Sequence, residues 1–191
     1  MSRRARPQKP NPNIALAVVG AGLILISIAA AFAIPQAQAA VRENEIGVTP
    51  VEVNFAAPDV QLTDLQGNPV ALSDYRGNVI LYNAWATWCP PCKAEMPVLQ
   101  AYYEKYKNQG FVVIAIEDGQ PLEEVAAFAQ TYKLTFLVWP DLEWRATKAW
   151  DIQALPTSYV IDRHGTARLT WSGEATLTML EKYVTPLILG Q

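Results

Sequence analysis

From residue 79 onward, short apolar runs alternate with helical segments, and this alternation limits the fold more than any other property of the chain. The apolar runs predict buried strands at residues 79–84, 111–116, 135–139 and 157–162. The segments between them have helical character at residues 92–109, 121–133 and 143–150. A chain that alternates β and α segments is expected to form a partly parallel sheet covered by helices on both faces, which is the α/β class.

Additional elements are expected on either side of this alternation. Residues 60–72 alternate loosely between apolar and polar side chains around a Gly-Asn turn, which predicts a small N-terminal β-hairpin. A turn at residues 164–165 leads into a returning strand at 166–171, which adds an antiparallel edge to the sheet. Residues 176–189 close the chain as a helix, which Pro186 is expected to shorten because proline disrupts a helix interior.

The N-terminal region has a different composition from the rest of the chain. Residues 1–13 form a basic tail, and residues 14–34 are an apolar run without a charged side chain. About 20 apolar residues span a bilayer core as a helix, so residues 14–34 predict a transmembrane anchor. Positive charge before a span keeps the tail in the cytoplasm and carries the remainder across the membrane. Residues 35–54 are interpreted as a linker, and residues 55–191 as a single domain.

A cleaved signal peptide is the alternative interpretation of this region. Residues 37–39 read Ala-Gln-Ala, which fits the pattern of small residues at a cleavage site. The apolar run at 14–34 is longer than the usual signal core of about 7–15 residues, which favours a retained, single-pass anchor in the cell membrane. Both interpretations place residues 41–191 on the extracytoplasmic side.

Charge and cysteine content exclude several classes of protein. The chain has 15 Lys and Arg against 18 Asp and Glu, and the basic cluster lies in the N-terminal tail, so nucleic acid is not an expected partner. Cys89 and Cys92 are the two cysteines, which is too few for a multi-bridge scaffold. With His164 as the single histidine, these cysteines do not complete a zinc site, and we expect no metal centre. Lys93 occupies the position at which a c-type haem motif has histidine.

The two cysteines stand at a predicted junction between a strand and a helix, in the sequence Trp88-Cys89-Pro90-Pro91-Cys92. The first turn of a helix has unpaired N–H groups and a partial positive charge, which stabilise a thiolate placed there. Such a position can lower a thiol pKa from about 8.5 to about 7. The prolines fit the first helical positions, where a missing N–H costs least, and leave the Cys92 N–H as the nearest donor to the Cys89 sulfur. The motif therefore predicts a redox-active dithiol.

A family resemblance lies in residues 57–97, which include WATWCPPCKAEMP, and continues through residues 155–157 and 160–165. In these stretches the chain resembles the TlpA/ResA-like branch of the thioredoxin superfamily, which comprises membrane-anchored, extracytoplasmic thiol-disulfide oxidoreductases. The resemblance covers residues 55–189. It implies a thioredoxin-like fold with an N-terminal β-hairpin and a central αβ insertion near residues 121–141, preceded by one transmembrane helix.

The same resemblance implies which residues contact the substrate. Pro156 matches the cis-proline that faces the active-site sulfurs and positions a substrate backbone in this family, and Leu155 precedes it. Trp88, Pro90 and Pro91 flank the first cysteine and are expected to line the substrate groove.

Glu95 matches a buried glutamate of this branch that assists proton transfer. It follows Cys92 by three residues, which places both on one side of a helix. Asn83 stands where ordinary thioredoxins have a buried aspartate, and since an amide does not titrate, Glu95 is the better candidate for acid–base chemistry. The alternative for Glu95 is a solvated carboxylate that complements the helix dipole.

The sequence thus predicts an enzyme that reduces disulfides of exported proteins, such as apocytochrome c thiols, with Cys89 attacking and Cys92 resolving. The Cys89–Cys92 pair would itself carry the electrons without an organic cofactor, and a membrane thiol-electron carrier would return electrons to it.

Three alternative functions stay open. An oxidant of the same fold would run the reaction in reverse. A copper-delivery module would use the two soft sulfur ligands, although no Met- or His-rich tract supports it. A peroxiredoxin-like enzyme would be expected to carry Thr-x-x-Cys, where this chain has Ala86.

Overall fold

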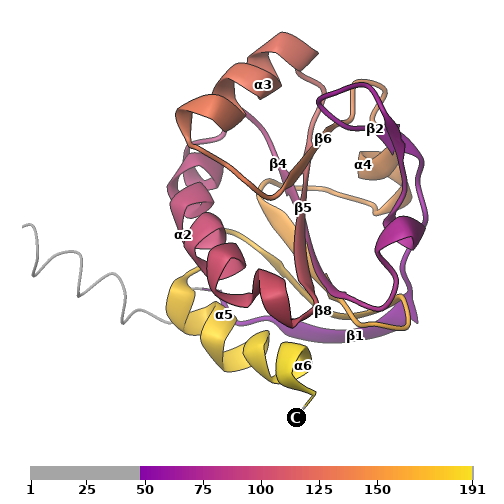
Figure 1. The fold of residues 1–191 in the computed structure, drawn as a ribbon, viewed down its shortest axis with the longest axis vertical. Helices are drawn as coiled ribbons and strands as arrows, with labels where there is room; N and C mark the ends of the chain where they lie inside the picture. The colour runs from indigo at the N-terminus through magenta and orange to yellow at the C-terminus, as the bar shows by residue number, and fades with distance from the viewer. Residues whose placement is uncertain (1–47, 191) are drawn as a thin grey trace, which may run out of the picture. The chain divides into compact units, whose positions relative to one another are not determined.

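The computed structural model describes residues 48–190, and the predicted tail, transmembrane span and most of the linker lie outside them. Within this range, no helix is long and apolar enough to cross a membrane. A six-stranded sheet runs through the centre of the domain in the order β1-β8-β7-β4-β5-β6 (Figure 1). Its strands are β1 (Val51–Ala56), β4 (Val79–Trp85), β5 (Phe111–Glu117), β6 (Leu137–Pro140), β7 (Thr157–Ile161) and β8 (Thr166–Ser172).

The predicted strand and hairpin elements are present. Strands β4, β5 and β6 are mutually parallel, whereas β7, β8 and β1 continue the sheet antiparallel. The N-terminal hairpin consists of β2 (Leu62–Thr63) and β3 (Pro69–Val70), which pair with each other outside the main sheet. The predicted αβ insertion contains α3 (Leu122–Thr131) and β6, which forms one edge of the sheet. The fold is therefore the mixed α/β fold that the alternation predicts.

The predicted linker boundary at residue 54 is wrong, because β1 already begins at Val51 and pairs antiparallel with β8. Five of the six β1 residues are exposed, including Val51 at 62%. An edge strand with little burial lacks the apolar run that marks an internal strand, so its sequence resembles a linker. Three residues before β1, Val48 lies against Gly173, whose N–H donates to the carbonyl of Pro156.

Helices cover the two faces of the sheet unequally. On one face pack α2 (Pro90–Tyr106), α3, α5 (Leu177–Tyr183) and α6 (Thr185–Leu189). The other face is covered by shorter elements, among them η1 (Leu72–Tyr75), the β2–β3 hairpin and α4 (Arg145–Ala149). Side chains of β4 alternate between the two faces, as a period of two requires, with Leu81 on the α2 side and Tyr82 on the α4 side.

Glycine, proline and arginine residues determine where the helices end or begin. Helix α2 continues through Pro97 and is followed by a 3-10 turn, η2 (Lys107–Gln109), which Gly110 ends with a left-handed φ of 73°. The predicted C-terminal helix divides into α5 and α6, with Pro186 in the first turn of α6, where proline is tolerated. The guanidinium of Arg163 holds the end of α6 by donating to the carbonyls of Leu187 and Ile188.

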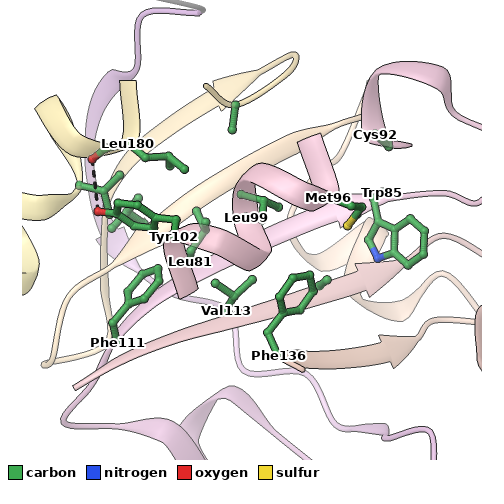
Figure 2. Close-up of a cluster of buried hydrophobic side chains, with 14 of the residues drawn as sticks. Leu81, Trp85, Cys92, Met96, Leu99, Tyr102, Phe111, Val113, Phe136 and Leu180 are labelled. Atoms are coloured by element: carbon green, nitrogen blue, oxygen red, sulfur yellow. Dashed lines mark hydrogen bonds between the residues drawn. The ribbon is translucent and has the colours of Figure 1, made fainter. Parts of the chain in front are cut away.

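The buried side of α2 ties the core to the cysteines. Figure 2 shows Cys92, Met96, Leu99 and Tyr102 along this helix, facing side chains of the sheet that include Leu81 and Val113. At the far end, the Tyr102 hydroxyl donates to the Leu180 carbonyl at 3.3 Å (Figure 2). All four α2 side chains have no exposed surface. Burial of this row fixes the helix against the sheet, and so fixes where its first turn begins.

Candidate active site

The two cysteines form a disulfide at the start of α2. Strand β4 ends at Trp85, a short loop follows, and Cys89 is the N-cap residue of α2. The Cα atoms of Cys89 and Cys92 are 5.3 Å apart, and their sulfurs are bonded. The Cys92 N–H donates to the Cys89 sulfur at 3.3 Å, and Pro90 and Pro91 occupy the first helical positions. The strand-to-helix junction therefore places the Cys89 sulfur at the positive end of the helix.

The two sulfurs differ in access. Cys89 keeps 3% of its surface exposed, while Cys92 has none. Neighbouring Trp88 is 60% exposed, and Pro90 and Pro91 are exposed as well. The exposed side of the disulfide is therefore the side of Trp88 and Cys89, whereas Cys92 is enclosed by the protein.

The Leu155–Pro156 segment lies at the same edge of the sheet. Its peptide bond is cis, Pro156 is buried and Leu155 is half-buried. Thr157, the next residue, pairs with Ala84 near the end of β4, so the segment approaches the loop that leads to Cys89. The fold thus brings two motifs that are far apart in the sequence to one end of the sheet.

Glu95 is buried on α2, one turn after Cys92. Its two carboxylate oxygens accept hydrogen bonds from Asn83 Nδ2 at 2.8 Å and from the Ala175 N–H at 2.9 Å. Asn83 also donates to the Ser158 hydroxyl at 3.0 Å, so this amide links the Glu95 carboxylate to β7. Burial raises the pKa of Glu95 from its ordinary value of 4.5 to about 7, against the opposing effect of its hydrogen bonds. The solvated alternative for Glu95 is therefore wrong.

A second buried carboxylate, Glu117, was not singled out from the sequence. It ends β5 and has no exposed surface. Its oxygens accept from the N–H groups of Thr87 at 3.4 Å and Gln120 at 2.8 Å. Burial raises the pKa of Glu117 from 4.5 to about 7, despite these two hydrogen bonds. An acidic residue directly after the apolar run 111–116 was the available signal.

Metal-ligating side chains do not cluster in this part of the chain. Across residues 48–190, no group of three or more His, Cys, Asp or Glu side chains is arranged to hold a metal ion. His164 lies in the turn between β7 and β8, where its N–H donates to the Asp162 side chain at 2.9 Å. Ala86, three residues before Cys89, is buried and offers no hydroxyl group to the sulfurs.

The chain has a thioredoxin-like fold with a cysteine pair at the start of a helix, in which Cys89 is slightly exposed and Cys92 is fully buried. This combination defines a thiol-disulfide oxidoreductase. Comparisons with known proteins agree with that class. Residues 53–170 match the model of the AhpC/TSA family. The thiol-disulfide oxidoreductase ResA of Geobacillus kaustophilus is 38% identical over 136 residues, which cover 71% of this chain and 78% of that protein. ResA of Bacillus subtilis is 33% identical over 128 residues, which cover 67% of this chain and 72% of that protein.

Solved structures resemble the fold as well. A Chlorobium tepidum structure described as a thiol:disulfide interchange protein of the DsbE type has a TM-score of 0.66 and 29% identity, covering 71% of this chain and 96% of that one. The chain belongs to the AhpC/TSA family and, within the thioredoxin superfamily, to the TlpA/ResA-like branch. It is a thioredoxin-like thiol-disulfide oxidoreductase, with Cys89 and Cys92 as its redox pair.

Proposed function

We propose that this enzyme reduces disulfides of exported proteins, with Cys89 as the attacking thiolate and Cys92 as the resolving thiol. The observation that carries this assignment is the N-cap position of Cys89, whose sulfur accepts the Cys92 N–H. Charge on that sulfur is stabilised by the helix terminus, and Cys89 is the more exposed of the two. A disulfide formed between apocytochrome c thiols is one substrate class that the resemblance to this family suggests.

The reaction consists of two exchanges. In the reduced enzyme, the Cys89 thiolate attacks one sulfur of the partner disulfide and displaces the other as a thiolate. Cys92 then loses its proton and attacks the Cys89 sulfur, which releases the second partner thiol. The partner gains two electrons and the enzyme becomes the disulfide seen here. No organic cofactor takes part in these steps, because the sulfurs carry the electrons.

Glu95 is proposed to accept the proton that Cys92 loses. It is buried on the same helix, one turn further along, and its pKa of about 7 suits proton transfer near neutral pH. Hydrogen bonds from Asn83 and Ala175 hold both oxygens of the carboxylate in place. A partner polypeptide would contact Trp88, Pro90 and Pro91 on one side of the sulfurs, and Leu155 and Pro156 on the other.

The cellular setting is proposed from the N-terminal sequence. The basic tail and the apolar run at residues 14–34 support a single-pass anchor with the domain on the extracytoplasmic side. A membrane thiol-electron carrier would then return electrons to the disulfide, and tethering raises the local concentration of the enzyme near it. Protease added to spheroplasts should digest the domain while cytoplasmic markers stay whole, and protection of the domain would contradict export.

Trapping of mixed disulfides tests the division of labour between the sulfurs. The reduced Cys92→Ser variant should accumulate covalent complexes with oxidised protein partners, which a reductant releases, because the resolving thiol is missing. The Cys89→Ser variant should trap few, because its remaining sulfur is buried. Complexes are counted on non-reducing gels. Equal trapping by both variants, or trapping by Cys89→Ser alone, would overturn the assignment.

A further inference from the structure

We propose that Glu117 is a positioning residue for disulfide exchange: its carboxylate joins the loop that presents Cys89 to the loop that follows β5. The structure assigns one oxygen of this carboxylate to each loop. Oε1 accepts from the Thr87 N–H, two residues before Cys89, and Oε2 accepts from the Gln120 N–H, just before α3. The inference concerns a step of the activity shown for this family, and it does not depend on the direction of electron flow.

The backbone around Glu117 reinforces this connection. Its carbonyl accepts from the Asp141 N–H at 2.8 Å, which brings in the loop after β6. The next residue, Asp118, donates its N–H to the Trp85 carbonyl at 2.9 Å. The loops that follow three parallel strands, β4, β5 and β6, therefore meet at this one residue. Thr87 is the point at which the network reaches the redox loop.

The Glu117 carboxylate lies on the same face of the sheet as the two cysteines. Along β5, Phe111, Val113 and Ala115 face α2, and alternation puts Glu117 on that same face. A buried charge is costly unless several donors satisfy it, so a conventional core position would hold an apolar residue. An apolar side chain at this position could not accept a hydrogen bond from either loop, whereas the Glu117 carboxylate accepts one from each.

The charge state of Glu117 should therefore control how firmly the redox loop is held. The charged side chains that act on it are Asp118 beside it and Glu124 on α3, and both raise its pKa together with burial, which is the larger cause. Asp141, directly after β6, is a further acid beside this network, and its N–H donates to the Glu117 carbonyl. Deprotonated, Glu117 accepts two charge-assisted hydrogen bonds; protonated, it is a weaker acceptor for Thr87. Because the neighbouring charged side chains are acidic, they favour protonation of Glu117 as the pH falls.

The first test is an NMR titration of the oxidised protein. As the pH falls, the amide protons of Thr87 and Gln120 should both shift upfield. Their titrations should share one midpoint near 7, the pKa of Glu117. Glu117→Gln should remove this shared titration, while Glu123→Gln, an exposed neighbour on α3, should leave it intact. Two amides that move independently, or a shared titration that persists in Glu117→Gln, would overturn the proposal.

The second test is kinetic and compares the variant with the parent enzyme at two pH values. At pH 8, the rate constant for attack of the reduced enzyme on a protein disulfide should fall about three- to tenfold in Glu117→Gln, since the amide accepts weakly and sets its NH₂ against one donor. At pH 5.5 the two enzymes should differ by less than about twofold, because the parent carboxyl is then neutral as well. Glu117→Asp, which keeps the charge, should restore part of the loss at pH 8. A ratio that is the same at both pH values would show a merely structural role.

Discussion

The two faces of the central sheet are built from the same strands but hold different kinds of side chain. The α2 face combines its apolar core with Cys89, Cys92, Glu95 and Glu117, all buried. The α4 face is filled by aromatic rings: Trp150 stacks on Tyr82 with ring centres 4.5 Å apart, and lies 4.7 Å from Tyr159. The α2 face holds buried polar groups, which lower stability unless they are hydrogen-bonded, and it holds the redox pair. The α4 face stabilises the fold by aromatic packing.

Their coverings differ in the same sense. Helix α2 is long, and the row of buried side chains along it fixes the first turn at which the disulfide sits (Figure 2). The α4 face is closed by short elements such as α4 and η1, which contribute single buried side chains, Ala146 and Leu72. Stability and reactivity are therefore separable in this molecule: substitutions on the aromatic face should lower stability without loss of the redox step.

Removal of an aromatic ring should give the largest effect on stability. Trp150→Ala is expected to lower the free energy of unfolding by about 3–5 kcal/mol, because it empties a buried site among stacked rings. Urea unfolding of the oxidised protein measures it. The exchange rate of the variant that remains folded should stay within about twofold of the parent.

Leu142→Ala is the matched control, since this side chain is 54% exposed and its loss should change stability by no more than about 0.5 kcal/mol. A folded Trp150→Ala protein with an exchange rate lowered tenfold or more would show that the aromatic face takes part in the chemistry.

Glu95→Gln should give the next largest effect, this time on rate. General acid–base groups contribute 10²–10⁴-fold, and we expect about 10²-fold because a thiol with a pKa near 8.5 ionises partly without help. The affected step is release of the mixed disulfide by Cys92, measured by stopped flow over pH 5–9. Loss of an inflection near pH 7 should accompany it. An unchanged rate and profile would leave Glu95 a structural acceptor for Asn83 and Ala175.

The third effect is the dependence of stability on pH. Burial raises the folded-state pKa of Glu95 and of Glu117 from 4.5 to about 7, so the folded protein retains protons that the unfolded chain releases. The stabilisation is present in full below about pH 4.5 and is lost as the pH rises through about 7. Between these values each of the two carboxyls should lower the free energy of unfolding by up to about 2–3 kcal/mol.

Urea titrations of the oxidised protein at several pH values measure this slope. Glu95→Gln should flatten part of it, because an amide side chain binds no proton in either state. A stability that stays level or rises between pH 5 and 7 would contradict the raised pKa values, and with them the difference between the two faces.

Much of this architecture could be predicted from the sequence, because internal strands and the redox motif have local signatures. The runs that became β4 and β5 are continuous and apolar, and the Cys-Pro-Pro-Cys motif marks the start of α2 without reference to the rest of the chain. The αβ insertion and the hairpin were likewise predicted from local patterns and the resemblance. Strand β1 was missed because its side chains are exposed, and exposure removes the apolar pattern.

The polar network of the site depends on contacts that no local pattern encodes. Glu95 was a candidate, but its burial depends on Ala175, which lies 80 residues further along the chain. Glu117 binds Thr87, 30 residues before it, through a backbone N–H whose availability the side chains do not report. Such contacts follow from the strand order, and strand order is a property of the whole chain.

The place at which the chain enters the domain matters for labelling it. Val48 lies against Gly173, which is hydrogen-bonded to Pro156, whereas Arg163 holds the end of α6 near Gln109, two residues before β5. A fluorophore or affinity tag inserted directly before residue 48 would therefore lie on the side of Pro156, which we propose contacts the substrate. The same group attached after residue 190 would lie near the starts of β4 and β5, at the end of the sheet away from the sulfurs.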